Sequence, residues 1–169
     1  MFPKNKINQT DTLFNPITMS DTIKSDTSIP HHDIPNSGVN PGNVVDYALT
    51  LLGTPYKYGS TDPAIGFDCS GFITYVFRHF NIAVPRSSIE FTNVGTPVDV
   101  SVSKRGDIIL FTGTDSTERN IGHIGIVVSN ENGKLQFIHS TSGKAYGVVI
   151  TELNQYYKGR FIKIVRVFP

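Results

Sequence analysis

A chain of 169 residues suits one domain, with a core that buries roughly two-thirds of the unfolded surface. Its 15 Lys and Arg residues nearly balance its 14 Asp and Glu residues, and no block of like charges occurs, which argues against nucleic acid or an anionic membrane as a partner. The single cysteine excludes an intramolecular disulfide, and no window reaches the roughly 18 apolar residues of a membrane span.

Residues 1–40 form a segment rich in Thr, Ser, Asn, Asp and Pro, whose apolar residues follow no helical or strand period. Such a segment buries too little surface to offset the entropy of ordering it, so we predict a polar, largely irregular tail or linker. The pair His31 and His32 is interpreted as part of this linker rather than as a metal site. The start shows no basic region followed by an apolar run and a cleavage site. Either the protein is cytoplasmic, or its export signal has been removed.

The composition changes at Asn40, where the first helix of the domain is predicted to begin. Asn40 can cap this helix with Pro41 at its first position, and the following apolar residues recur at helical spacing up to Leu52. Gly53 is expected to end the helix. An irregular loop rich in Gly and Pro then leads to Cys69.

A second helix is predicted over residues 69–80, with Asp68 as its cap, because apolar residues recur there at intervals of three and four. The sulfur of Cys69 would lie in the first turn, where unpaired N–H groups and the helix dipole favour the thiolate. Asp68 opposes this effect, so a lowered cysteine pKa also requires a cationic neighbour. Gly71 is expected to let this end of the helix approach the sheet closely.

Beyond the second helix the pattern changes to strands. A short helical piece is expected over residues 88–91. The apolar segments that follow are 107–111, 123–128, 135–139, 147–151 and 161–168. Because the helices come first and the strands follow, we predict an α+β domain in which N-terminal helices pack against an antiparallel β-sheet.

Two histidines, His123 and His139, lie at the ends of predicted strands. His79 falls near the end of the second helix, where the negative end of the helix dipole accounts for it. A cysteine nucleophile needs a base within hydrogen-bond reach, and that base needs a third group to hold its tautomer. Cys69, His123 and His139 supply one candidate for each role.

The two histidines can act together only if they share a face of the sheet, which depends on the hairpin between their strands. A two-residue turn at Asn132 and Gly133 with an unbroken register places them on opposite faces, because side chains alternate along a strand. A three-residue loop over residues 131–133 pairs Gly125 with His139 and places both imidazoles on one face. We predict this loop, or a bulge with the same effect.

Five motifs in order, GTPYKYG, FDCSGF, KRGDIILF, GHIGIVV and FIHSTSG, resemble those of the NlpC-type bacterial cell-wall peptidases, a papain-like cysteine peptidase family. The resemblance implies a papain-like peptidase domain over residues 41–169. It also implies that Cys69 is the nucleophile, His123 the general base and His139 the polar residue that orients the base. Papain-like hydrolases need no metal, and no cofactor is expected.

The resemblance also assigns roles to residues near the cysteine. Tyr56 matches the family tyrosine that lines the site and helps to stabilise the oxyanion, whereas Tyr58 matches an aromatic position for which packing is expected. Asp68 and Ser70 match residues placed to hold the substrate peptide, particularly a free amino end. Asp68 is thus expected to cap the helix, to hold substrate, or both.

The activity implied by the resemblance is hydrolysis of an amide bond in peptidoglycan stem peptides, typically between the γ-carboxyl of D-glutamate and a diamino acid. We expect a monomer whose partners are peptidoglycan stem peptides or fragments. Such a substrate indicates a periplasmic or secreted protein of the cell envelope, with a cytoplasmic recycling role as the alternative.

Three other interpretations compete with the peptidase. One Cys and two His equal the three protein ligands of some catalytic zinc sites, but the chain has no Cys-x-x-Cys or His-x-x-x-His spacing. A catalytically inactive wall-binding domain would have no need of Cys69, His123 and His139. Related papain-like folds include acyltransferases and other amidases, but permuted relatives place the histidine before the cysteine, so the order Cys, His, His favours the peptidase.

Overall fold

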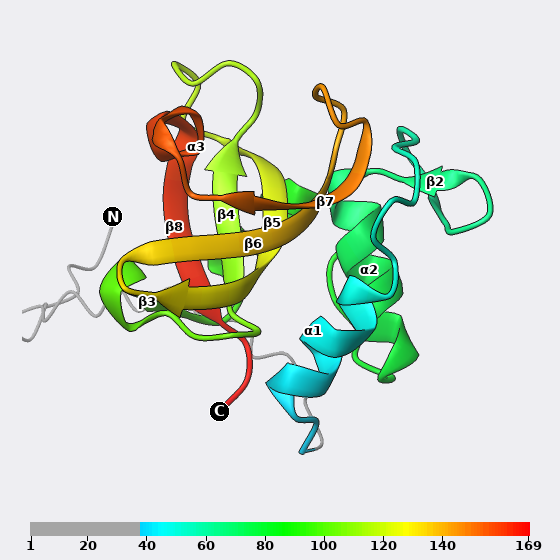
Figure 1. The fold of residues 1–169 in the computed structure, drawn as a ribbon, viewed down its shortest axis with the longest axis horizontal. Helices are drawn as coiled ribbons and strands as arrows, with labels where there is room; N and C mark the ends of the chain where they lie inside the picture. Colours follow the sequence, from blue (N-terminus) through cyan, green and yellow to red (C-terminus); the bar gives the residue numbers. More distant parts are fainter. Residues whose placement is uncertain (1–37) are drawn as a thin grey trace, which may run out of the picture.

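The computed structural model describes residues 38–169, so the predicted tail, with His31 and His32, lies almost entirely outside the described residues. Two helices lie together on one side of a sheet, and a short third helix lies toward the other side (Figure 1). The helices are α1 (Pro41–Leu49), α2 (Cys69–His79) and α3 (Gln155–Arg160), with 3₁₀ helices η1 (Ser88–Asn93) and η2 (Val100–Val102). The strands are β1 (Thr61–Asp62), β2 (Gly66–Phe67), β3 (Thr96–Val98), β4 (Ile108–Thr112), β5 (Ile121–Glu131), β6 (Lys134–Thr141), β7 (Gly147–Glu152) and β8 (Phe161–Arg166).

Six strands form one sheet in the order β3-β8-β4-β5-β6-β7, and every neighbouring pair is antiparallel. The five predicted strands correspond to β4 through β8, so the expected α+β class, with N-terminal helices and an antiparallel sheet, is confirmed. The sequence pattern missed α3, the edge strand β3 and the two-residue strands β1 and β2. Pro97 lies in β3, and proline is restricted to edge strands because it cannot donate to a ladder.

The first helix begins where its capping signals predict. The side chain of Asn40 accepts a hydrogen bond from the backbone N–H of Gly42, and Pro41 is the first helical residue. The helix ends at Leu49, and turns continue to Gly53, whose φ of 83° is left-handed. None of the helices within residues 38–169 is long and apolar enough to cross a membrane.

The start of α2 is held against the preceding loop. Asp68 caps the helix as predicted, because its Oδ1 accepts a hydrogen bond from the backbone N–H of Gly71. A Cβ added to Gly71 would overlap the carbonyl oxygen of Ser60, and the same oxygen accepts the N–H of Asp68 at 3.2 Å. The expectation that Gly71 lets the helix approach the sheet was therefore wrong, since the close neighbour is the loop.

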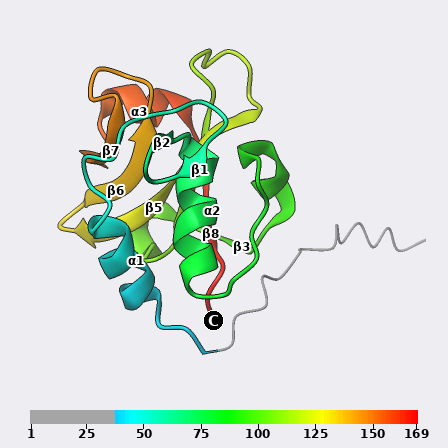
Figure 2. The same ribbon diagram turned by 90° about the vertical axis from the view of Figure 1, so that its right-hand side faces the viewer.

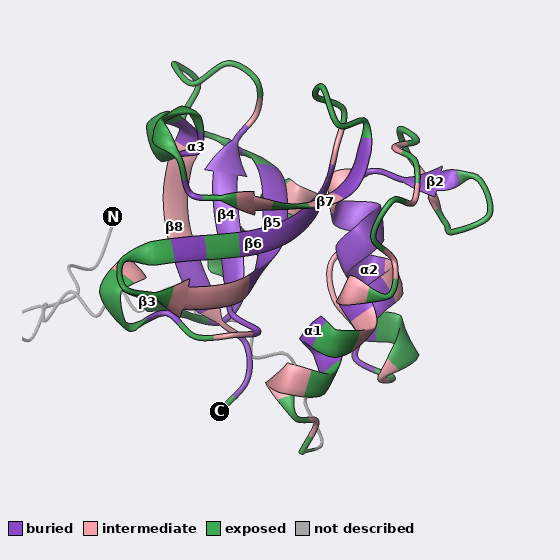
Figure 3. Cartoon of the chain, viewed as in Figure 1, coloured by how far each residue is buried: buried purple, intermediate pink, exposed green. Residues whose placement is uncertain are grey.

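Apolar side chains cover both faces of the sheet, and the central strands and the inner side of α2 are buried (Figure 3). On the first face, α1 and α2 pack against the strands through Val44, Val45, Phe72, Val76, Leu110, Ile124, Ile126 and Ile138. The second face buries Ile109, Phe111, Val127, Phe137, Tyr157 and Ile164. Complete burial of one such side chain contributes about 1.5–3 kcal/mol, so both layers stabilise the frame on which the histidine strands lie. Figure 2 shows α2 lying across the sheet.

The hairpin between β5 and β6 has a two-residue turn, not the predicted three-residue loop. Glu131 pairs with Lys134, and Asn132 and Gly133 lie between them with φ values of 52° and 75°. Two consecutive left-handed residues are the geometry of a type I′ turn, which Asn-Gly favours. The predicted loop over residues 131–133 was therefore wrong.

A bulge in β5 has the effect that was predicted for that loop. The register shifts at Val128, so that Ile126 pairs with Ile138 beyond it. Continuing this register places Gly125 opposite His139, which is the predicted pairing. The alternative prediction of a bulge that brings both imidazoles to one face is confirmed.

Candidate active site

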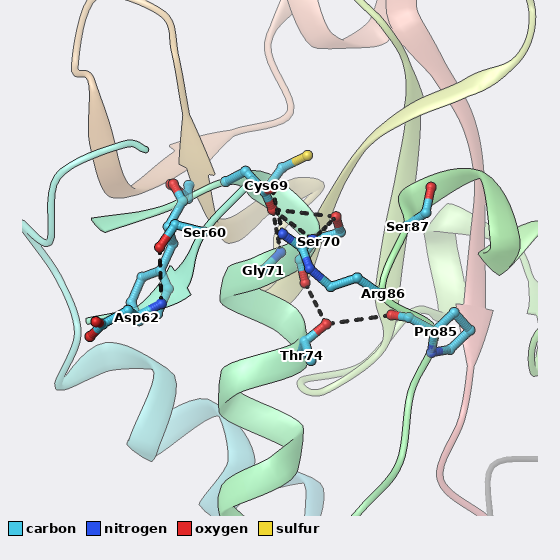
Figure 4. Close-up of polar contacts among 12 residues, drawn as sticks. Ser60, Asp62, Cys69, Ser70, Gly71, Thr74, Pro85, Arg86 and Ser87 are labelled. Atoms are coloured by element: carbon cyan, nitrogen blue, oxygen red, sulfur yellow. Dashed lines mark hydrogen bonds and ion pairs between the residues drawn. The ribbon is translucent and has the colours of Figure 1, made fainter. Parts of the chain in front are cut away.

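Cys69 is the first residue of α2, and its side chain is partly buried. Its Sγ lies 4.0 Å from the carbonyl oxygen of Gly122, the residue before His123. The sulfur points away from the polar contacts that Ser70 and Arg86 make (Figure 4). The described part of the chain shows no hydrogen bond between Cys69 and His123, and catalytic hydrogen bonds often tighten only when substrate binds.

The thiol of Cys69 is held in its protonated form by its surroundings. Burial, and then the negative charge of Asp68, raises its pKa above the ordinary value, whereas the backbone N–H groups of Ser70 and Cys69 and the charge of Arg86 lower it. The backbone N–H groups at the helix start thus lower the cysteine pKa as expected, but burial and Asp68 raise it by more. Cys69 therefore needs a base to remove its proton.

His123 and His139 meet on the second face of the sheet. His123 Nε2 lies 2.8 Å from His139 Nδ1, and the rings are nearly perpendicular, at 84°. His139 is fully buried and His123 is 8% exposed. His139 Nε2 in turn lies 2.9 Å from the hydroxyl of Thr151 in β7. The three side chains form a hydrogen-bonded row in which His123 Nδ1 takes no part.

Both imidazoles are neutral at neutral pH. Burial lowers the pKa of His123 well below 6.5, with smaller contributions from His139 and Arg160. Burial, followed by the charge of Arg160, lowers the pKa of His139 to about 3. A neutral His123 that accepts a proton at Nδ1 must bear hydrogen on Nε2. It then donates to His139 Nδ1, and His139 donates from Nε2 to Thr151.

A second bulge brings the backbone that precedes His123 close to the cysteine. Phe111 of β4 pairs with His123 and Thr112 with Ile121, so Gly122 is the extra residue of β5. A Cβ on Gly122 would lie 2.6 Å from the backbone nitrogen of Gly113. Only glycine therefore permits this bulge, which places the Gly122 carbonyl beside the sulfur.

Asp68 and Ser70 are joined by Arg86, which the sequence analysis did not identify. Arg86 donates from Nη1 to Asp68 Oδ1 at 3.0 Å and from Nη2 to Oδ2 at 2.7 Å, and Nη1 also lies 3.0 Å from Ser70 Oγ. The carboxylate that was expected to hold a substrate amine is thus already paired. The helix cap is confirmed, and substrate binding by Asp68 and Ser70 stays a prediction.

Tyr56 and Tyr58 have different surroundings. Tyr56 lines the same groove as Cys69 and its ring lies 5.6 Å from that of Tyr146. Burial, and then the neighbouring Cys69, raises the pKa of Tyr56, so its hydroxyl remains a hydrogen-bond donor. Tyr58 is 85% exposed, so the expectation that it packs was wrong.

The groove has a volume of about 680 Å³ and extends from the cysteine past the base to α3. Its walls include Tyr56, Cys69, His123, Thr151, Tyr156 and Arg160. Asp68, Ser70 and Arg86 do not line it. The cysteine thus separates two chemically different regions, an ion-paired cluster on one side and the groove on the other.

The remaining candidates do not add a second site. Within residues 38–169, no group of three His, Cys, Asp or Glu side chains is arranged to hold a metal ion, so the zinc interpretation gains no support. His79 is the last residue of α2 and stacks on Tyr47 with ring centroids 3.7 Å apart. This position agrees with the predicted interaction with the helix dipole.

Comparisons with known proteins find relatives of this chain whose names are those of cell-wall hydrolases. The sequence model of the NlpC/P60 family matches residues 53–166. The chain is 38% identical over 126 residues to a gamma-DL-glutamyl hydrolase of Bacillus subtilis (strain 168). It is 34% identical over 126 residues to the murein DD-endopeptidase MepS/murein LD-carboxypeptidase of Escherichia coli (strain K12). Both alignments cover 73% of this chain, but only 29% and 61% of the respective relatives.

Solved structures agree with the sequence match. An NlpC/P60 family protein from Bacillus cereus ATCC 10987 superposes with a TM-score of 0.68 and 26% identity, over 78% of this chain and 41% of that one. The NlpC/p60 domain of the peptidoglycan hydrolase SagA superposes with a TM-score of 0.62 and 27% identity, over 76% of this chain and 99% of that domain. The similarity thus covers a whole domain of this kind.

Proposed function

The chain belongs to the NlpC/P60 family, and on this basis we propose that it is a cysteine peptidase that hydrolyses amide bonds in peptidoglycan stem peptides. In this proposal residues 41–169 form the peptidase domain and residues 1–40 a tail or linker. Cys69 is the nucleophile, His123 the general base and His139 the residue that orients it. Peptidoglycan is a cell-envelope polymer, so we propose that the protein acts in the periplasm or after secretion.

The observation that carries this proposal is a pair of buried, hydrogen-bonded imidazoles, one of which lines the same groove as the cysteine. His123 Nε2 and His139 Nδ1 are 2.8 Å apart, and the Cys69 sulfur lies 4.0 Å from the backbone of the residue before His123. A nucleophile, a base and a group that orients the base are the parts that covalent amide hydrolysis needs. A wall-binding domain without turnover has no use for this arrangement.

The resting state of the pair is a thiol and a neutral imidazole. When the substrate carbonyl lies over the start of α2, His123 Nδ1 removes the proton from Cys69 as the sulfur attacks the carbonyl carbon. The backbone N–H groups at the helix start and the Tyr56 hydroxyl donate to the oxyanion that forms. Electrostatic stabilisation of this kind accounts for a large part of the rate in acyl transfer.

The same imidazole completes the reaction. Protonated His123 gives its proton to the leaving nitrogen, the C–N bond breaks, and the acyl group remains on Cys69. A water molecule, deprotonated by His123, then attacks the thioester and regenerates the thiol. His139 holds the base in one orientation through both steps, because its Nδ1 accepts from His123 Nε2.

The bond that we propose is the one between the γ-carboxyl of D-glutamate and a diamino acid. The name of the Bacillus subtilis relative, gamma-DL-glutamyl hydrolase, supports this bond. The name of the Escherichia coli relative, murein DD-endopeptidase/murein LD-carboxypeptidase, points instead to other bonds. We favour the first because the chain is more similar to the Bacillus subtilis protein. Asp68 and Ser70 are proposed to hold the acyl part of the substrate.

Digestion of purified peptidoglycan tests the proposal. The wild-type protein should release peptide fragments, and mass spectrometry of defined stem peptides should place the cut after D-glutamate. Cys69→Ala should release none while its unfolding transition stays close to that of the wild type. Ser116→Ala, in an exposed loop, serves as the control and should retain full activity. Fragment release by Cys69→Ala would refute the nucleophile, and a cut at another bond would refute the proposed specificity.

A further inference from the structure

Arg160, the last residue of α3, is a buried cation in the wall of the groove. It is 7% exposed, and no carboxylate pairs with it within residues 38–169. Nη1 donates to the Tyr156 hydroxyl at 2.8 Å and Nη2 to the carbonyl oxygen of Thr112 at 2.9 Å. The buried Nε has no partner in this part of the chain. Burying a charge without an opposite charge is costly, so an anionic ligand nearby would stabilise this guanidinium.

Tyr156 connects the Arg160 guanidinium to the groove through a hydrogen bond. Because its oxygen accepts a hydrogen bond from Arg160, its own O–H remains free to donate. The side chain is 59% exposed and lines the groove. The guanidinium carbon lies 5.2 Å from the centre of the Tyr156 ring, so the two side chains hold each other in place.

Lys144 supplies a second cation to the same groove. It is exposed in the loop between β6 and β7 and lines the groove, and no ion pair engages it in the described chain. That loop and α3 lie at the same end of the molecule (Figure 1). No Asp or Glu of the described residues lines the groove, so its charged lining is entirely positive.

The position of the base decides which part of a substrate enters this groove. A general acid must reach the leaving nitrogen, so the leaving part of the substrate lies against His123. The groove continues from His123 toward α3, whereas Asp68, Ser70 and Arg86 lie outside it. The groove is therefore the site of the leaving amine and of the residues attached to it.

We infer that Tyr156 and Lys144, with Arg160 behind Tyr156, form a subsite for a free carboxylate on the leaving side of the scissile bond. The identity of the substrate in this inference rests on the proposed function. The negative charge of the bound group is inferred from Arg160, which has no carboxylate partner within residues 38–169. The ligand class is a diamino acid, or a short peptide that begins with one, bearing an ionised carboxyl group. An amidated leaving group would lack the charge that this subsite binds.

Filling the subsite also has a consequence for catalysis. The charge of Arg160 lowers the pKa of both His123 and His139, although burial is the larger cause for each. A carboxylate close to Arg160 offsets that charge and makes the imidazolium easier to form. Binding of the correct leaving group would thus strengthen the base that the reaction needs.

Peptide binding to Cys69→Ala tests the subsite without requiring turnover. Isothermal titration compares two stem peptides that differ only in a leaving-side carboxylate or carboxamide. The carboxylate peptide should bind about tenfold or more tightly, as expected for a charge-assisted hydrogen bond, and less so at high salt. Adding Tyr156→Phe or Lys144→Met should reduce this preference several-fold. Lys158→Met removes an exposed charge on α3 outside the groove and should leave the preference unchanged.

The outcomes separate the subsite from the proposed reaction. Equal affinity for the two peptides would overturn the subsite, as would a preference that neither Tyr156→Phe nor Lys144→Met reduces. A preference that both variants reduce supports the subsite, even if the wild-type protein cleaves neither peptide. Absence of cleavage by the wild type together with that preference would instead overturn the peptidase function.

Discussion

The hydroxyl of Ser140 donates a hydrogen bond of 2.7 Å to the carbonyl oxygen of Phe67. Ser140 follows His139 in β6, and Phe67 lies two residues before Cys69, so this bond connects the histidine strand to the segment that leads into the nucleophile helix. Ser140 is fully buried. The distance between the base and the nucleophile therefore depends partly on a side chain that takes no part in the chemistry.

Replacing this serine should weaken both the fold and the reaction. Ser140→Ala should lower the free energy of unfolding by about 1 kcal/mol, because the Phe67 oxygen keeps only its second donor, the backbone N–H of Lys57. Peptide hydrolysis should fall several-fold even where the protein is fully folded. Urea unfolding and initial rates measure the two effects, with the exposed-loop variant Ser116→Ala as the control. Equal rates for the two variants would show that this hydrogen bond does not position the site.

Gly71 is the position where a single methyl group should be most damaging. A Cβ there would overlap the Ser60 carbonyl oxygen, which is backbone and cannot rotate away. Gly71→Ala should therefore lower the free energy of unfolding by about 3 kcal/mol or more. Gly159→Ala is the matched control, because nothing lies within 4 Å of its Cβ position and alanine in a helix is favoured by up to about 1 kcal/mol. Similar unfolding midpoints for the two variants would contradict this account of the α2 start.

The features that could be predicted from the sequence rest on short-range effects. Asn40 and Asp68 cap their helices through backbone groups two and three residues away, and strand alternation is visible within five or six residues. The position of Cys69 at a helix start followed directly from these signals. The motif series predicted the family and the pair of histidines.

The features that were missed depend on contacts between distant residues. Arg86 could not be chosen as the partner of Asp68, because nothing in its local sequence distinguishes it from other arginines. Thr151 lies at the end of a predicted strand, but its contact with His139 requires knowledge of which strand lies beside β6. Val128 is an ordinary strand residue, so its bulge could be stated only as an alternative that would bring the histidines together.

The burial of His139 should make the stability of the protein depend on pH. Its pKa is about 3 in the folded state against about 6.5 when unfolded, so the unfolded chain binds the proton more readily between these values. The free energy of unfolding is thus highest above pH 6.5 and falls as the pH drops from 6.5 toward 3. The loss approaches about 1.4 kcal/mol per pH unit for one such histidine, and the buried neutral His123 acts in the same direction.

Urea unfolding at pH 7.5 and pH 5 measures this dependence. His139→Asn cannot titrate in this range, so its free energy of unfolding should fall less between the two pH values than that of the wild type. Ser116→Ala, in an exposed loop, removes no titratable group and should retain the wild-type difference. An equal fall in His139→Asn and the wild type would contradict a neutral, buried His139.

Thr151 should act on the reaction through the tautomer of His139. If the hydroxyl accepts from His139 Nε2 at 2.9 Å, Nδ1 is free to accept from His123, and His123 Nδ1 is then free to take the thiol proton. Thr151→Val removes the acceptor and leaves Nε2–H without a partner, so the other tautomer of His139 gains population. In that tautomer His139 donates to His123 Nε2, and His123 presents a hydrogen rather than a lone pair to Cys69.

The expected result is a fall in kcat of about tenfold for Thr151→Val, with KM changed much less. This is less than the roughly 10²–10⁴-fold that loss of a general base costs, because His123 itself is retained. Thr151→Ser keeps the hydroxyl and should retain most of the wild-type kcat, which separates the hydrogen bond from the loss of packing. NMR of the imidazole nitrogens provides a second measurement, because the protonated nitrogen of His139 should be Nε2 in the wild type and mixed in Thr151→Val. An unchanged kcat in Thr151→Val, or an equal loss in both variants, would mean that Thr151 contributes packing rather than control of the tautomer.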